Sequence, residues 1–147
     1  MRPITTGSTS MRRTVRYLGL AAVLVLAAGS CAQKYSAERD GKDLGQALCD
    51  LRGATSAEEA GSALSEVQEE LDELASNYSM FTAEDRADID EQLNDLAEHI
   101  AQGNEVLIQQ DLAVMRRSIS NIRGDVDDTS EAAWDGVLQG LDDCIPG

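Results

Sequence analysis

Three side chains between residues 91 and 99 have a spacing that could bind a divalent metal ion. Glu91, Asp95 and His99 follow one another at intervals of four, which places them in one row on a helix. Carboxylate and imidazole groups are ligands for such ions. His99 is the only histidine, however, and a di-iron bundle site needs glutamate three residues before a histidine, where Leu96 stands. A solvated acidic row is the favoured interpretation, and we expect no metal site.

A second acidic group, formed by Asp125, Asp127 and Asp128, has some features of a calcium-binding loop. An EF-hand loop needs glycine at its sixth position and glutamate at its twelfth. Counted from Asp125, those positions hold Ser130 and Gly136. The group is better explained as an acidic turn that caps the following helix.

The sequence contains no recognisable catalytic motif. Gly-x-Ser-x-Gly, His-Glu-x-x-His and the phosphate-binding glycine loop are all missing from it. A pair of carboxylates can hydrolyse glycosides, but with 27 acidic residues the presence of such pairs discriminates nothing. We therefore expect a protein that is not an enzyme and has no cofactor. A divalent-metal-binding protein and a carboxylate-based envelope hydrolase remain as alternatives.

The one basic cluster in the second half of the chain consists of Arg116, Arg117 and Arg123. Arg116 and Arg123 are seven residues apart and share a helix face. They could bind an acidic partner or an anionic wall polymer. Alternatively, they could form ion pairs with neighbouring acidic helices, each worth little where it is exposed.

The first 31 residues combine a basic segment, an apolar segment and a cysteine. The basic segment holds Arg12, Arg13 and Arg16. The apolar segment 17–28 has 12 residues, too few to span a bilayer, which takes about 20. Small residues then lead to Cys31. This arrangement resembles the signal peptide of bacterial lipoproteins, although Ala28 stands where that family usually has leucine.

The resemblance implies an address for the protein. Residues 1–30 would be removed as a signal peptide, with Met11 as an alternative start, and Cys31 would carry a lipid. The protein would then be anchored to the outer face of a bacterial cytoplasmic membrane. Ordinary cleavage after Ser30 or Ala32, which would give a secreted protein, and export by the twin-arginine route both stay open.

The number of cysteines agrees with lipidation. If Cys31 carries the lipid, Cys49 and Cys144 remain to pair in an oxidising compartment. An exported chain cut after Ser30 without lipidation would instead carry an odd thiol. The count therefore favours the anchor.

The chain from Cys31 onward is one small, strongly acidic domain of 117 residues. It contains 8 basic and 27 acidic residues, which gives a net charge of −19. Such a domain repels nucleic acid, so we expect no nucleic-acid partner. A charge this high is also typical of disordered chains, but the spacing of the apolar residues argues against disorder.

Apolar residues recur at alternating intervals of three and four, which predicts amphipathic helices. The clearest stripe consists of Ala60, Leu64, Val67, Leu71, Leu74 and Tyr78. We expect five helices, over residues 37–51, 57–78, 83–102, 105–123 and 130–143. Candidate capping boxes are Ser56 with Glu59, Thr82 with Asp85, and Asp128 with Glu131. Candidate left-handed helix ends are Gly53, Gly103 and Gly124.

Short connections make neighbouring helices antiparallel. The sequence therefore predicts an all-α, up-and-down bundle over residues 37–147, joined to the lipid by a tether of residues 31–36. The first and fifth helices then run in the same direction. This places Cys49 and Cys144 at the same end, as a disulfide requires. Closing a loop of about 95 residues would stabilise the fold by roughly 4–5 kcal/mol in the chain-entropy model.

The short tether predicts which end of the bundle faces the membrane. That end contains the start of the first helix, the turn near residues 78–81 and the start of the fifth helix. The aromatic residues of the mature chain are Tyr35, Tyr78, Phe81 and Trp134, all near these points. Because Tyr and Trp favour membrane interfaces, Tyr78, Phe81 and Trp134 form a candidate interaction surface together with Arg116 and Arg123. The alternative, favoured by the rarity of exposed aromatic patches, is that the rings close the core.

These observations predict a lipid-anchored, non-enzymatic cell-envelope protein. Its membrane contact is the lipid on Cys31, and its bundle binds another envelope protein or a wall component. The sequence leaves the oligomeric state open.

Overall fold

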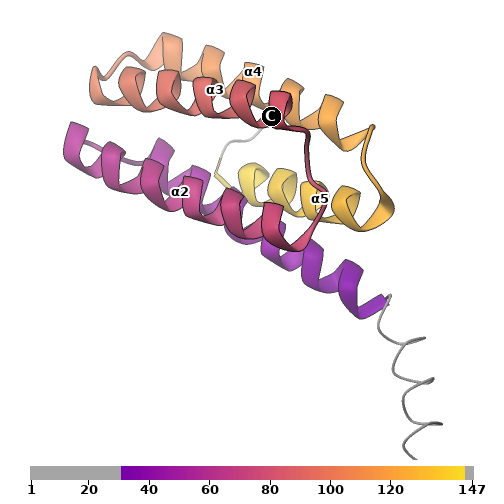
Figure 1. Cartoon of the computed structure of the whole chain (residues 1–147). Coiled ribbons are helices and arrows are strands. Elements are labelled where there is room, and N and C mark those ends of the chain that lie inside the picture. Colours follow the sequence, from indigo (N-terminus) through magenta and orange to yellow (C-terminus); the bar gives the residue numbers. More distant parts are fainter. Residues whose placement is uncertain (1–30, 145–147) are drawn as a thin grey trace, which may run out of the picture. The chain divides into compact units, whose positions relative to one another are not determined.

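The structure, a computed structural model, describes residues 31–144 and is all-α over this range, without strands. The bundle lies within the part of the chain that starts at Lys34. The helices are the first helix (31–52), α2 (Ala57–Asn77), α3 (Ala83–Ala101), α4 (Glu105–Arg123) and α5 (Asp128–Asp142), shown in Figure 1. The prediction of an all-α bundle of about five helices is confirmed.

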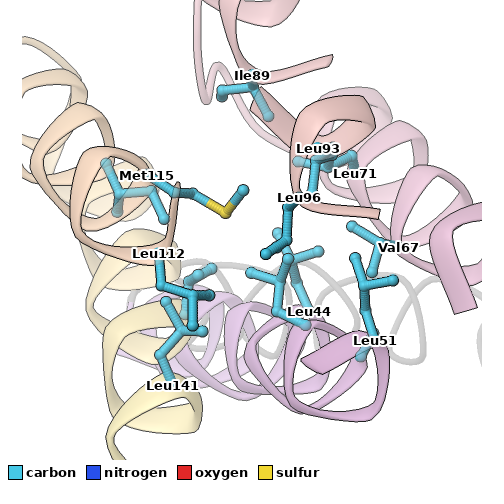
Figure 2. Packing of buried hydrophobic residues seen from close by; sticks show 14 of the residues in the cluster. Leu44, Leu51, Val67, Leu71, Ile89, Leu93, Leu96, Leu112, Met115 and Leu141 are labelled. Atoms are coloured by element: carbon cyan, nitrogen blue, oxygen red, sulfur yellow. The ribbon is translucent and has the colours of Figure 1, made fainter. Parts of the chain in front are cut away.

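From α2 onward, consecutive helices pack against one another, and the first helix packs against α5. Contacts join α2 to α3, α3 to α4 and α4 to α5, while glycines join the first helix to α5. The core lies between them and receives apolar side chains from every helix. Leu44, Val67, Leu93, Met115 and Leu141 are examples, each at most 3% exposed (Figure 2). Removal of this apolar surface from water is the main stabilising contribution to the fold.

Helix bounds agree with the predicted ones for the three central helices. α2, α3 and α4 end within one residue of the expected positions. The first helix differs, because residues 31–36, expected as a tether, are already helical. That segment contains no proline or glycine, and most of its residues have moderate or good helix propensity. α5 differs too, because it begins at Asp128 rather than at residue 130.

The start of α5 and the start of α2 are capped differently from the prediction. Asp127, rather than Asp128, is the N-cap of α5, and its side chain accepts a hydrogen bond from the Ser130 amide at 2.9 Å. At α2, Glu59 does not return to the capping serine. Its carboxylate instead accepts from both the amide and the hydroxyl of Thr55, at 2.9 and 2.8 Å. In this arrangement the Glu59 carboxylate accepts two hydrogen bonds, whereas in a capping box it would accept one.

The other predicted capping box is complete. The Thr82 hydroxyl accepts from the Asp85 amide, and the Asp85 carboxylate accepts from the Thr82 amide, both at 3.1 Å. Gly103, with φ of 68°, has the only positive φ among the described residues and separates α3 from α4. Gly53 and Gly124 therefore do not take the left-handed conformation expected of them.

Two ends of the bundle can be defined. The aromatic end contains Lys34, the turn 78–82 and Asp127, and the cysteine end contains Cys49 and Cys144. The Lys34 ammonium lies 3.6 Å from Asp128, next to the start of α5. This ion pair and the hydrogen bonds from Tyr78 to Asp40 and from Trp134 to Met80 bring together the start of the first helix, the α2–α3 turn and the start of α5. No helix among residues 31–144 combines the length and the hydropathy needed to cross a membrane.

Candidate functional site

Trp134 anchors the aromatic end from inside the core. Its side chain is 1% exposed, and its indole N–H donates to the carbonyl oxygen of Met80 at 2.9 Å. The Phe81 ring lies 6.2 Å from it between centroids, tilted by 52°. Such tilted aromatic pairs add about 0.5–1.5 kcal/mol beyond the area they bury. Trp134 therefore closes the core, and a partner docking on this surface would meet Phe81 rather than Trp134.

Tyr78 and Tyr35 have different surroundings. The Tyr78 side chain is half-buried, and its hydroxyl donates to Asp40 on the first helix at 2.9 Å. Burial, together with the hydrogen bond to Asp40, raises the pKa of Tyr78 to about 12. Tyr78 thus joins the α2–α3 turn to the first helix. Tyr35 is 72% exposed.

Arg116 and Arg123, the predicted basic pair, face the carboxylates of α5. The Arg116 guanidinium lies 2.7 Å from Asp142. Arg123 pairs with Glu131 at 3.1 Å and also with Asp135. Both arginines thus join α4 to α5, as the ion-pair interpretation of the sequence expects. A partner would reach them only in competition with these carboxylates.

His99 does not act with the row on its own helix. Its Nδ1 lies 2.5 Å from the Asp111 carboxylate on α4, whereas Glu91 and Asp95 are exposed. The hydrogen bond that the His99 ring donates to Asp111 raises the pKa of His99, and the negative charges of Asp111, Glu98 and Asp95 add to the shift. Within residues 31–144, no three His, Cys, Asp or Glu side chains converge as metal ligands.

The acidic residues of the α4–α5 turn have separate roles. Asp127 caps α5, and the hydrogen bond from the Ser130 amide lowers the pKa of its carboxylate. Asp128 pairs with Lys34. Asp125 is exposed. These three side chains do not surround one ion.

Two surface hollows at the aromatic end together form what we call the acidic groove. The larger, of about 290 Å³, lies at the α2–α3 and α4–α5 turns, and the smaller, of about 150 Å³, lies between α3 and α4. They share Asp85 and Ile122. The groove is lined by Asp85, Asp88, Asp125 and Asp127, by Phe81, Ile89, Ile122 and Val126, and by Ser79, Thr82, Ser118 and Asn121. Sequence reasoning missed this site, because its walls come from three separate segments.

Cys49 and Cys144 form a disulfide, with their Cα atoms 5.8 Å apart, and Cys31 is an exposed free cysteine. The disulfide lies at one end of a close contact between the first helix and α5, which the sequence analysis did not predict. Ala37, Gly41, Gly45 and Cys49 follow one another at intervals of four on the first helix. Ala132, Gly136, Gly140 and Cys144 repeat the series at the same intervals in the last part of the chain.

We call the contact between these two series the glycine seam. A Cβ added at Gly45 would lie 2.5 Å from the carbonyl oxygen of Val137, and one added at Gly140 would lie 2.8 Å from that of Lys42. A Cβ at Gly41 or Gly136 would also overlap the facing backbone. The two helices run parallel with their backbones in contact. Small residues at intervals of four are the signal that could have revealed this contact from the sequence.

Comparison with protein-family models, with curated proteins and with solved structures finds no significant match for this chain.

Proposed function

We propose that this protein is exported and held at the outer face of a bacterial cytoplasmic membrane by lipidated Cys31. There its helical bundle binds another envelope protein and does not catalyse a reaction. The basic and apolar segments before Cys31 support the export and the anchor. The acidic surface and the acidic groove support the binding role.

The ion pair between Lys34 and Asp128 is the observation that carries the proposed orientation. At 53% exposure of the lysine side chain the pair adds little stability, but it places residue 34 at the aromatic end. Cys31 precedes Lys34 by three residues, which span at most about 11 Å of chain. A membrane that holds acylated Cys31 is therefore close to the aromatic end and to the acidic groove.

The glycine seam joins the helix that follows the proposed anchor to the rest of the bundle. The first helix is part of the bundle from Lys34 onward. That helix is joined to α5 by close backbone contact and by the disulfide between Cys49 and Cys144. A pull on this helix from residue 34 would therefore reach α5 as well.

The charge of the domain indicates the kind of partner. With 27 acidic and 8 basic residues after position 30, the surface has a negative field that attracts basic surfaces and repels acidic ones. A partner with a basic surface would associate faster, and its association would slow as salt screens the field.

The intact mass of the protein recovered from host membranes tests the proposed anchor. We expect a chain that begins at Cys31 and carries a diacylglyceryl group, with a gain of about 2 Da on reduction of the disulfide. The Cys31→Ser variant should lose the lipid and leave the membrane fraction. An unmodified chain recovered from the medium would contradict the proposal.

Cross-linking in intact cells tests the proposed partner. A photoreactive residue at Asn121, on the wall of the acidic groove, should capture one dominant protein. The matched control carries the same residue at Ser62, an exposed position near the start of α2. Diffuse recovery that is the same from both positions would count against a specific partner.

A further inference from the structure

The acidic groove combines an apolar floor with a rim of carboxylates. Phe81, Ile122 and Val126 line the larger hollow, and Ile89 and Ile122 line the smaller one. The acidic residues Asp85, Asp88, Asp125 and Asp127 stand around them, and no basic residue is among the lining residues of either hollow. A ligand that fits must therefore bring both positive charge and apolar surface.

The rim carboxylates are available for a ligand to different degrees. The carboxylates of Asp85 and Asp127 accept hydrogen bonds from the backbone amides of Thr82 and Ser130, which leaves part of each carboxylate for other contacts. Asp88 and Asp125 are exposed and have no ion pair among residues 31–144. Within the described part of the chain, no ion pair neutralises these two charges.

The arginines closest in sequence to the groove do not neutralise it. Arg86 pairs with Asp72 at 2.8 Å and with Asp90 at 3.0 Å, and its guanidinium lies 5.8 Å from the centre of the Phe81 ring. Arg123 pairs with carboxylates of α5. The Phe81 ring thus already contacts one guanidinium, a contact in which cations and aromatic faces attract each other.

The rim carboxylates do not converge on one point, which excludes a single metal ion as the natural occupant. No group of three or more such side chains in the described part of the chain is close enough to bind one ion. Separated negative charges instead match several separated positive charges. The two hollows share Asp85 and Ile122, so the acidic rim extends over both, from Asp88 in the smaller hollow to Asp125 in the larger one. A short extended segment, at about 3.3–3.6 Å per residue, can present several side chains along such a rim.

We propose that the acidic groove binds a short basic segment of a partner protein, in which lysine or arginine side chains alternate with an aliphatic one. The basic side chains lie against Asp88 and Asp125, and the aliphatic one covers Val126 and Ile122. This inference rests on the proposed function and names the chemistry of its partner. Because the groove is at the aromatic end, that segment belongs to a partner close to the membrane surface.

Calorimetric titration of the purified full-length chain tests the groove with defined probes. The first probe is the acetylated, amidated peptide Lys-Leu-Lys-Leu-Lys, and the others replace every lysine by glutamate or every leucine by serine. We expect saturable binding of the first probe, weaker binding of the serine probe and no binding of the acidic one. Binding of the first probe should weaken as salt rises.

Two pairs of variants with equal charge separate the groove from the general field. Replacing Asp88→Asn and Asp125→Asn together should weaken binding of the first probe about fivefold or more, since each exposed ion pair contributes modestly. The control replaces Glu66→Gln and Glu69→Gln on α2, which removes the same charge elsewhere and should change affinity less than about twofold. Val126→Thr should weaken binding of the leucine probe but not of the serine probe.

Two results would overturn the inference. Equal weakening by both pairs of variants would show that only the overall charge attracts the peptide, and absence of saturable binding would show that the groove does not hold it. Neither result bears on the proposed lipid anchor, which is tested separately by the intact mass of the protein. Conversely, a chain without lipid could still bind the peptide, so the two ideas fail separately.

Discussion

Gly45 and Gly140 bring the backbones of the first helix and α5 into direct contact. A Cβ built on Gly45 would lie 2.8 Å from the Cα of Gly140, and one built on Gly140 would lie 2.9 Å from the Cα of Gly45. Neither position has room for a side chain. The obstacle on each side is backbone, which cannot move aside as a flexible side chain could.

Replacing Gly45→Ala should destabilise the protein. The added methyl group must push the first helix away from α5, and overpacking of this kind costs about 1–3 kcal/mol. Urea unfolding with the disulfide intact measures the change in the free energy of unfolding. Gly61→Ala on α2 is the matched control, because nothing lies within 4 Å of its added Cβ. That variant should gain roughly 0.5–1 kcal/mol from helix propensity. Equal stability of the two variants would disprove the close contact.

Removing the disulfide with Cys49→Ser and Cys144→Ser should lower the free energy of unfolding by about 2–5 kcal/mol. The two residues are 95 positions apart, so without the bond the unfolded chain gains the entropy of a long open loop. Thermal unfolding of the double variant and of the reduced wild-type protein should give the same lowered midpoint. A midpoint unchanged by reduction would mean that the bond does not constrain the unfolded chain as expected.

The stability supplied by His99 should depend on pH. Its pKa is raised above 6.5 in the folded state by the hydrogen bond with Asp111, so its contribution is fully present below pH 6.5. It is lost as the pH rises through the folded-state pKa. Because His99 is the only histidine, its imidazole resonance can be followed by NMR without assignment. Asp111→Asn should lower the pKa of His99. An unchanged titration curve would exclude Asp111 as the cause.

Glu70→Gln should stabilise the protein at neutral pH. Partial burial is the main cause that raises the pKa of Glu70 above 4.5, with further contributions from Glu73, Asp43, Glu66 and Asp40. A carboxyl whose pKa is raised by folding binds its proton more tightly in the folded state, so its ionised form disfavours folding. This penalty is present at pH 7 and disappears as the pH falls below 4.5. Removing the charge should add a few tenths of a kcal/mol, given the remaining exposure of the side chain.

Melting curves from pH 7 down to pH 4 test the Glu70 prediction. The difference in midpoint between the Glu70→Gln variant and the wild-type protein should shrink as the pH falls. Glu58→Gln serves as a control, because that side chain is exposed in the first turn of α2, where its charge suits the helix dipole. If the difference in melting midpoint for Glu70→Gln grew as the pH fell, the pKa of Glu70 would be lowered by folding rather than raised.

The helices themselves could be predicted well from the sequence. The buried residues of the stripe from Ala60 to Leu74 all lie on one face of α2. The helix begins directly after its N-cap Ser56 and stops at Asn77, within one residue of the predicted bounds. Alternating direction then brings Cys49 and Cys144 together. These features depend on local spacing, which a sequence displays directly.

Contacts between helices were less predictable. Glycines at 41, 45, 136 and 140 look like weak points of two helices until the helices are seen to touch there. Trp134 looks suited to an interface, yet its N–H finds the Met80 carbonyl inside the core. The acidic groove needs the packing of α3 against α4 before its walls exist. These contacts and the groove depend on which helix surfaces pack together, and the sequence of a single helix does not reveal its packing partner.

The position of the disulfide determines how the bundle would carry mechanical load. The bond joins Cys49 on the first helix to Cys144, just after the end of α5, at the end of the bundle opposite the one at which Lys34 meets Asp128. A pull on the chain at residue 34 would act along the first helix and load the glycine seam in shear. Because the far ends of both helices are covalently joined, the first helix cannot slide out of the bundle alone. A tension applied at the membrane would therefore reach α5 as well as the first helix, through a covalent link.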